Sequence, residues 1–175
     1  MRGSAVRRLF ALAVTASVLA IPGKPSFSAE SRETSTLRGA GALKVFVRLK
    51  VGDAGAQRLG LTQNQLQTDL EAKLKKAAIP LAKNAGSYLV LSVSILSISH
   101  PTVDGILAYV STAQLKFLQG ATLDANGQRA TVTTWDEVRF GAMSPAKDLD
   151  KRIRGSIGGL VDKFVADYLA ENPAP

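Results

Sequence analysis

The chain has 175 residues, of which 22 are basic, 14 are acidic, 46% are hydrophobic and none is cysteine. This length suits one domain with one hydrophobic core. The absence of cysteine excludes disulfides, thiolate metal sites, a cysteine nucleophile and a lipid attached to an N-terminal cysteine.

Residues 1–29 have the features of a secretory signal peptide. Three arginines within the first eight residues are followed by an uncharged apolar run at 9–21, then by Pro22 and small residues. The run of thirteen residues is too short to span about 30 Å of hydrocarbon as a helix. We therefore expect a periplasmic or secreted protein. Because the leader holds four of the basic residues and no acidic one, the mature net charge falls from +8 to +4, and nucleic acid is not an expected partner.

Residues 30–41 are polar, small and unpatterned, which predicts a flexible mature N-terminus. A single α/β domain is expected over residues 42–173. Its first strand begins at Leu43, where apolar side chains recur at every second position, and a glycine-containing loop follows at 52–60.

The next segment predicts a helix that ends before Pro80. Thr62 and Gln65 have the spacing of a capping box, in which each side chain bonds the other residue's backbone N–H. Leu66, Leu70 and Leu74 then recur at helical spacing and predict one buried face.

Three strands are expected next, over 89–98, 106–119 and 130–140, and Asn126-Gly127 predicts the hairpin turn between the last two. In the first of these strands the apolar residues change parity at Leu96. A β-bulge in this strand would explain the change. So would a strand whose far end is covered on the face opposite to the one buried at its start.

Ser144 and Pro145 predict the start of a last helix, whose wide apolar stripe would lie across the sheet. Glycines at 155, 158 and 159 each cost such a helix about 1 kcal/mol relative to alanine, and close approach to the sheet is the expected compensation. The order strand, helix, strand, strand, strand, helix predicts an α+β fold. We expect a two-layer sandwich of a four-stranded mixed sheet with both helices packed on one face.

No catalytic residue, metal ligand or cofactor-binding motif is expected. His100 is the only histidine, and no spacing in the sequence supplies it with metal co-ligands or with a catalytic partner. Asp136 and Glu137 are adjacent in a predicted strand, so they point to opposite faces and cannot act as a pair.

The candidate interaction residues are Trp135, Arg139, Lys147, Lys151 and Arg154. The single tryptophan either packs in the core or anchors a partner, since tryptophan and arginine are enriched at binding hot spots. The basic residues of the last helix form either a solvated face or a surface for peripheral contact with an anionic membrane or polysaccharide.

Three parts of the sequence resemble a family of small exported bacterial proteins of unassigned function. They are Leu59 to Thr62 with the helical segment Leu66 to Glu71, the strand segment Thr133 to Trp135, and the closing segment Val161 to Pro173. The module is similar to those of envelope accessory proteins of the transport-auxiliary and curli-secretion type. The resemblance implies a compact α/β fold that assembles with partners and has no active site. Unlike the lipoproteins of this type, the chain has no cysteine to lipidate.

The first hypothesis is therefore a periplasmic, non-enzymatic accessory or assembly protein that binds an envelope protein partner or further copies of itself. The alternative is a carrier of a small ligand or lipid, with a cavity between sheet and helices lined by Leu91, Val93, Leu115 and Phe164. A hydrolase ranks last, because no acid, base and nucleophile converge in the sequence.

Overall fold

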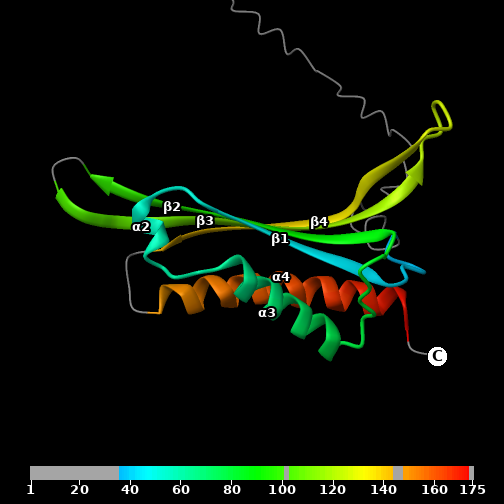
Figure 1. Cartoon of the computed structure of the whole chain (residues 1–175), viewed down its shortest axis with the longest axis horizontal. Helices are drawn as coiled ribbons and strands as arrows, with labels where there is room; N and C mark the ends of the chain where they lie inside the picture. The colour runs from blue at the N-terminus through cyan, green and yellow to red at the C-terminus, as the bar shows by residue number, and fades with distance from the viewer. Residues whose placement is uncertain (1–35, 101–102, 144–147, 174–175) are drawn as a thin grey trace, which may run out of the picture.

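The computed structural model describes residues 36–100, 103–143 and 148–173. Its elements in chain order are β1 (Leu43–Val51), α2 (Ala54–Gln57), α3 (Gln63–Lys76), β2 (Ser87–His100), β3 (Val103–Thr122), β4 (Arg129–Met143) and α4 (Leu149–Glu171). The sheet forms one layer, and α3 and α4 lie side by side beneath it (Figure 1). This arrangement confirms the predicted α+β fold with two helices on one face.

The strand order in the sheet is β1-β2-β3-β4. β1 pairs with β2 in parallel, with Leu43 opposite Ser87 and Val51 opposite Ile95. The other two pairs are antiparallel. The parallel pair requires a crossover, and α3 lies within it. The sheet curves, so that in Figure 1 both of its ends bend away from the helices.

The capping box of α3 is present as predicted. The Gln65 backbone N donates to the Thr62 hydroxyl at 3.2 Å, and the Thr62 backbone N donates to Gln65 Oε1 at 3.1 Å. The helix ends at Lys76, before it reaches Pro80, because Ala78 adopts a positive φ of 57°.

The loop predicted at 52–60 contains a single helical turn, α2. The Asp53 carboxylate accepts a hydrogen bond from the Ala56 backbone N at 2.8 Å, as a capping side chain does. A second oxygen of the same carboxylate accepts from the Ser97 backbone N at 2.8 Å, which ties α2 to β2.

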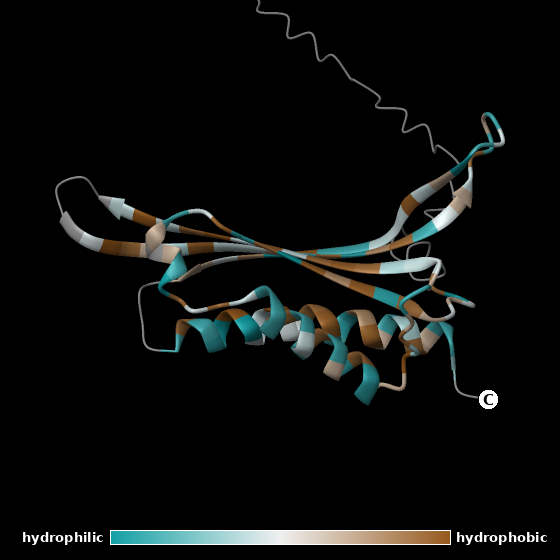
Figure 2. Cartoon of the chain, viewed as in Figure 1, coloured by the Kyte–Doolittle hydropathy of each residue, from teal (hydrophilic) through white to brown (hydrophobic). Residues whose placement is uncertain are grey.

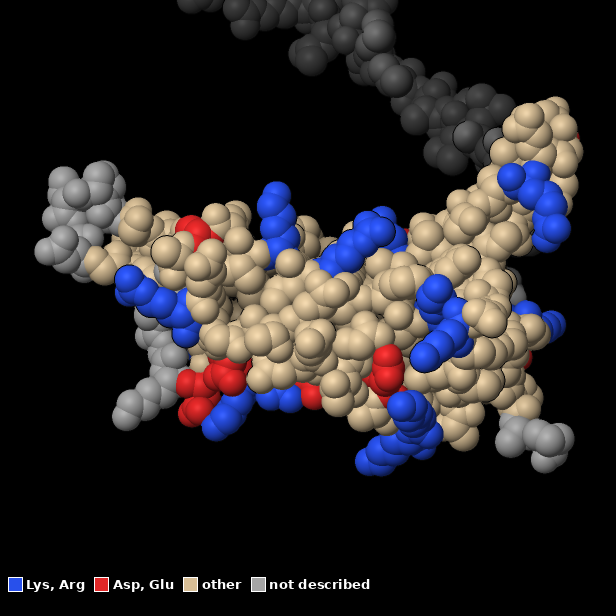
Figure 3. Space-filling view, in the orientation of Figure 1, with Lys and Arg blue, Asp and Glu red and all other residues tan. Residues whose placement is uncertain are grey.

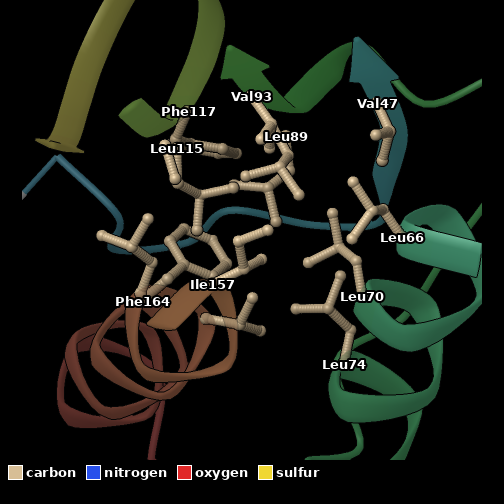
Figure 4. Close-up of a cluster of buried hydrophobic side chains, with 14 of the residues drawn as sticks. Val47, Leu66, Leu70, Leu74, Leu89, Val93, Leu115, Phe117, Ile157 and Phe164 are labelled. Atoms are coloured by element: carbon tan, nitrogen blue, oxygen red, sulfur yellow. The ribbon is translucent and has the colours of Figure 1, made fainter. Parts of the chain in front are cut away.

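The core lies between the two layers. Every second side chain of β2 from Leu89 to Ile95 is buried, as expected for a sheet with one covered face. Apolar colour is concentrated on the surfaces that face each other, and hydrophilic colour on the outer sides of the helices (Figure 2). The labelled side chains that converge there are Val47, Leu66, Leu70, Leu74, Leu89, Val93, Leu115, Phe117, Ile157 and Phe164 (Figure 4).

An aromatic cluster joins α4 to the sheet. The Phe164 ring, which is fully buried, lies 5.2 Å from Trp135, 5.9 Å from Phe117 and 6.0 Å from Tyr168, measured between ring centroids. The Trp135 ring meets Phe164 edge-on at 70°. Such edge-to-face pairs add to the stabilisation that burial of apolar surface provides.

α4 begins at Leu149 after Asp148, not at Ser144 and Pro145, which lie outside the described residues. Asp148 has a positive φ of 63°, and its side chain pairs with Lys151 instead of capping the helix. The predicted close approach of the three glycines to the sheet is not found. A Cβ at Gly159 would lie 2.9 Å from the end of the Arg139 side chain of β4, one at Gly158 would lie 3.3 Å from the Lys73 side chain of α3, and one at Gly155 would meet nothing within 4 Å.

The described part of the segment predicted to be flexible, residues 36–41, is packed against the domain. Leu37 is fully buried. Asn172 donates to the Leu37 carbonyl at 2.8 Å, and the Tyr168 hydroxyl donates to the Ala40 carbonyl at 2.7 Å. The segment is short and polar in sequence, but its single leucine fills the end of the core, so the prediction of flexibility is wrong for these residues.

Two phenylalanines provide a matched test of the core. Phe164→Ala is expected to lower the free energy of unfolding by about 3–5 kcal/mol, because it leaves a cavity in the aromatic cluster. Phe140→Ala removes a ring that is 80% exposed and should change stability by no more than about 0.5 kcal/mol. Chemical denaturation of both variants measures the difference, and equal losses would contradict this assignment of the core.

Tyr168 predicts a loss of stability at alkaline pH. Burial raises the pKa of its hydroxyl, so the folded state holds this proton more tightly than the unfolded chain, whose tyrosine pKa is about 10. The contribution of the protonated Tyr168 hydroxyl to the free energy of unfolding is therefore complete below about pH 10. It is lost as pH rises through the folded-state pKa. In Tyr168→Phe the decline in melting temperature above about pH 10 should be shallower. Tyr88→Phe is the control, and the same flattening in both variants would contradict the assignment.

Candidate functional site

Trp135 is a core residue in this structure. Its side chain is 2% exposed, and its Nε1 donates to the Asp167 carboxylate of α4 at 2.9 Å. The same carboxylate oxygen lies 3.2 Å from Lys163 Nζ. The polar end of the indole is therefore already bonded within the domain. Of the two interpretations of the sequence, the core interpretation is the one that this geometry supports, and Trp135 is not available as a surface anchor.

Arg139 is exposed, but it projects toward the helix layer. Its guanidinium lies beside Gly159 of α4. Because alternate residues of a strand point to the same face, Trp135 and Arg139 both lie on the side of β4 that faces the helices. Together they form no outward-facing site.

The predicted basic set of the last helix is largely neutralised where it is described. Arg154 makes two hydrogen bonds to the Asp69 carboxylate of α3, at 2.7 and 2.8 Å. The Asp69 carboxylate, by hydrogen bonding and by its charge, raises the pKa of the Arg154 guanidinium. Lys151 pairs with Asp148 at 2.6 Å, and Lys147 lies outside the described residues. The Arg154–Asp69 contact links α4 to α3, whereas the Lys151–Asp148 pair lies within the first turn of α4.

A groove of about 340 Å³ lies between α3 and α4. Its apolar lining includes Leu66, Leu70, Ile157 and Val161, and its rim carries the Asp69–Arg154 pair. The residues proposed for a carrier cavity are instead packed in the core. Leu91, Val93, Leu115 and Phe164 are each at most 1% exposed, and they line neither this groove nor the grooves beside Lys75 and Lys76.

Within the described ranges, no three histidine, aspartate or glutamate side chains are grouped as metal ligands. His100 is the last residue of β2, and its side chain lies outside what is described. None of the helices in the described ranges has the length and apolarity needed to cross a bilayer.

The feature that the candidate residues do not include is the open face of the sheet, meaning the face opposite α3 and α4. Its exposed apolar side chains are Phe46 (39%), Leu96 (52%), Ile98 (46%), Val138 (37%) and Phe140 (80%). Strand register brings most of them to one end. Leu96 lies opposite Val110, which lies opposite Ala142, and Phe140 is in the adjacent row opposite Thr112.

The change of parity at Leu96 is the sequence signal for this face. The β2–β3 register runs without a break from Tyr88 to Ile98, so no bulge occurs at Leu96. The strand instead carries apolar side chains on both faces at this end, and in the described chain Leu96 and Ile98 remain exposed.

Basic side chains share the open face. Arg48 and Lys50 alternate with buried positions of β1, and Lys116 occupies the same face of β3. Among the described side chains of the four strands, Asp136 is the acidic residue on this face, and it accepts a hydrogen bond from Gln114 at 3.1 Å. Lysine and arginine side chains are visible along both the sheet side and the helix side of the molecule, whereas most of the visible acidic side chains lie on the helix side (Figure 3).

No protein-family model matches the chain, and no curated protein matches it in sequence. The solved structures that are similar in arrangement include the following three. PelC from Paraburkholderia phytofirmans, described as a dodecamer, is 14% identical over 74% of this chain and 88% of its own, with a TM-score of 0.38. A hypothetical protein from Chlamydia trachomatis is 10% identical over 72% and 98%, with a TM-score of 0.39. Rare lipoprotein B from Shewanella oneidensis is 11% identical over 73% and 95%, with a TM-score of 0.32. At these identities and TM-scores the similarities establish neither a family nor a function.

The Asp69–Arg154 pair predicts a measurable coupling between α3 and α4. Both side chains are partly exposed, at 40% and 39%, so the coupling energy in a double-mutant cycle of Asp69→Ala and Arg154→Ala should be about 0.5–1 kcal/mol. Denaturation of the two single variants and the double variant measures it, and a strictly additive cycle would show that the two side chains do not interact.

Proposed function

We propose that this protein is an exported, non-enzymatic accessory protein that acts by binding another component of the cell envelope through the open face of its sheet. The predicted signal peptide supports the compartment. The observation that carries the proposal is the cluster of exposed apolar side chains on that face, in particular Phe140 at 80% exposure.

Exposed apolar side chains gathered on one face mark interaction surfaces. Leu96 and Phe140 lie in adjacent rows of three neighbouring strands, so a partner could cover them together. An aromatic ring at such a position provides a large contact area and loses little conformational entropy on binding. Arg48 and Lys50 add positive charge to the same face, which favours negatively charged partners over positively charged ones.

Site-specific photocrosslinking in the native cells tests this proposal. A photoreactive residue at Phe140 should capture one discrete envelope component, whereas the same residue at Ala166, an exposed position on α4, should not. A folded Phe140 variant that captures nothing, or that gives the same products as the Ala166 variant, would contradict binding through the open face.

A further inference from the structure

The open face has a transverse order that suggests the shape of its partner. In one row Lys50, Ser94, Thr112 and Phe140 lie opposite one another across the four strands. In the next row the corresponding residues are Arg48, Ser92, Gln114 and Val138. These two rows thus have a cation on β1, polar side chains in the middle and an apolar side chain on β4. The adjoining row of Phe46, Val90, Lys116 and Asp136 does not share this order.

We name Arg48 and Lys50 the basic edge, and Val138 and Phe140 the apolar edge. Three strand spacings of about 4.8 Å separate β1 from β4, which gives a face about 14 Å wide. An α-helix with its side chains is about 10–12 Å across. One helix laid along the strands would therefore reach both edges, and the short side chains of Ser92 and Ser94 leave room for it between them.

Charge decides what kind of helix fits. In the described part of the chain Arg48, Lys50 and Lys116 take part in no ion pair, and Asp136 is engaged by Gln114. A second copy of this chain packed face to face would bring a single described strand carboxylate, Asp136, to this face, together with the same three cations. A flat lipid surface does not match a sheet whose two ends bend away from the helices toward the open side (Figure 1).

Resting on the proposed function, we infer that the open face binds an acidic amphipathic helix of a partner protein, with carboxylates at the basic edge and apolar side chains at the apolar edge. From the row of Arg48 and Ser92 to Ile98 is six residues along β2, or about 20 Å. A helix of about 14 residues or more spans this length. The bound helix would give the sheet a second helical layer.

The test uses the purified chain and a designed probe. The probe is an 18-residue peptide with leucines on one helical face and glutamates on the other. Its two controls are the same peptide with lysine in place of glutamate and a peptide of identical composition in shuffled order. Fluorescence anisotropy should show binding of the acidic amphipathic peptide alone, and the affinity should fall several-fold between low and high salt.

Matched variants locate the binding. Arg48→Glu with Lys50→Glu should weaken the acidic peptide at least about tenfold and improve binding of the lysine peptide. Phe140→Ser should weaken it at least about fivefold. Lys76→Glu with Arg152→Glu makes the same change in net charge on exposed positions of the helix layer and should have little effect.

Equal binding of all three peptides, or equal effects of the two double variants, would overturn the inference. Binding to anionic phosphatidylglycerol vesicles that is lost in Arg48→Glu with Lys50→Glu, with no binding of any peptide, would also overturn it in favour of a lipid surface. A discrete protein captured at Phe140 in cells together with a failed peptide test would leave the proposed function standing and reject the acidic helix.

Discussion

The packing of Phe164 between the layers is the contact on which the arrangement depends. Its ring touches aromatic side chains of β3, β4 and α4 itself, namely Phe117, Trp135 and Tyr168. Burial of such rings is among the largest favourable contributions of single side chains to folding. It holds the long C-terminal helix on one face of the sheet, where α3 already lies because of the crossover between β1 and β2. Among the described residues, no helix covers the opposite face of the sheet.

Much of this fold could be predicted because its signals are local. Alternation of apolar residues from Leu43, the Thr62–Gln65 capping box and the Asn-Gly turn each act within a few residues, and the structure contains all three elements they predict. The single turn of α2 and the packing of Leu37 were missed. The packing of Leu37 depends on a contact with the distant Asn172. The turn of α2 has a local cap, Asp53 on Ala56, but it is also held by the distant contact of Asp53 with Ser97.

The candidate site was harder to predict for a related reason. A tryptophan beside charged residues has the same pattern whether it is buried or exposed, and the bond from Trp135 to Asp167 joins residues 32 positions apart. Likewise Arg154 looks unpaired in sequence, because its partner Asp69 lies 85 positions away on another helix. The open face did leave a signal at Leu96 and Ile98, but only the register shows that these side chains meet those of β3 and β4. The change of apolar parity in the sequence therefore indicates that a strand has exposed apolar residues, but it does not show which residues of the other strands lie beside them.

The contacts of residues 36–40 with the end of α4 have a topological consequence. Asn172 bonds both Leu37 and Gly39, and Arg38 pairs with Glu171 at 3.0 Å, so the first and last parts of the described domain are neighbours in space. A circularly permuted chain, joined across this corner and opened at the exposed Asn126-Gly127 turn, would retain every layer, every strand neighbour and the whole open face.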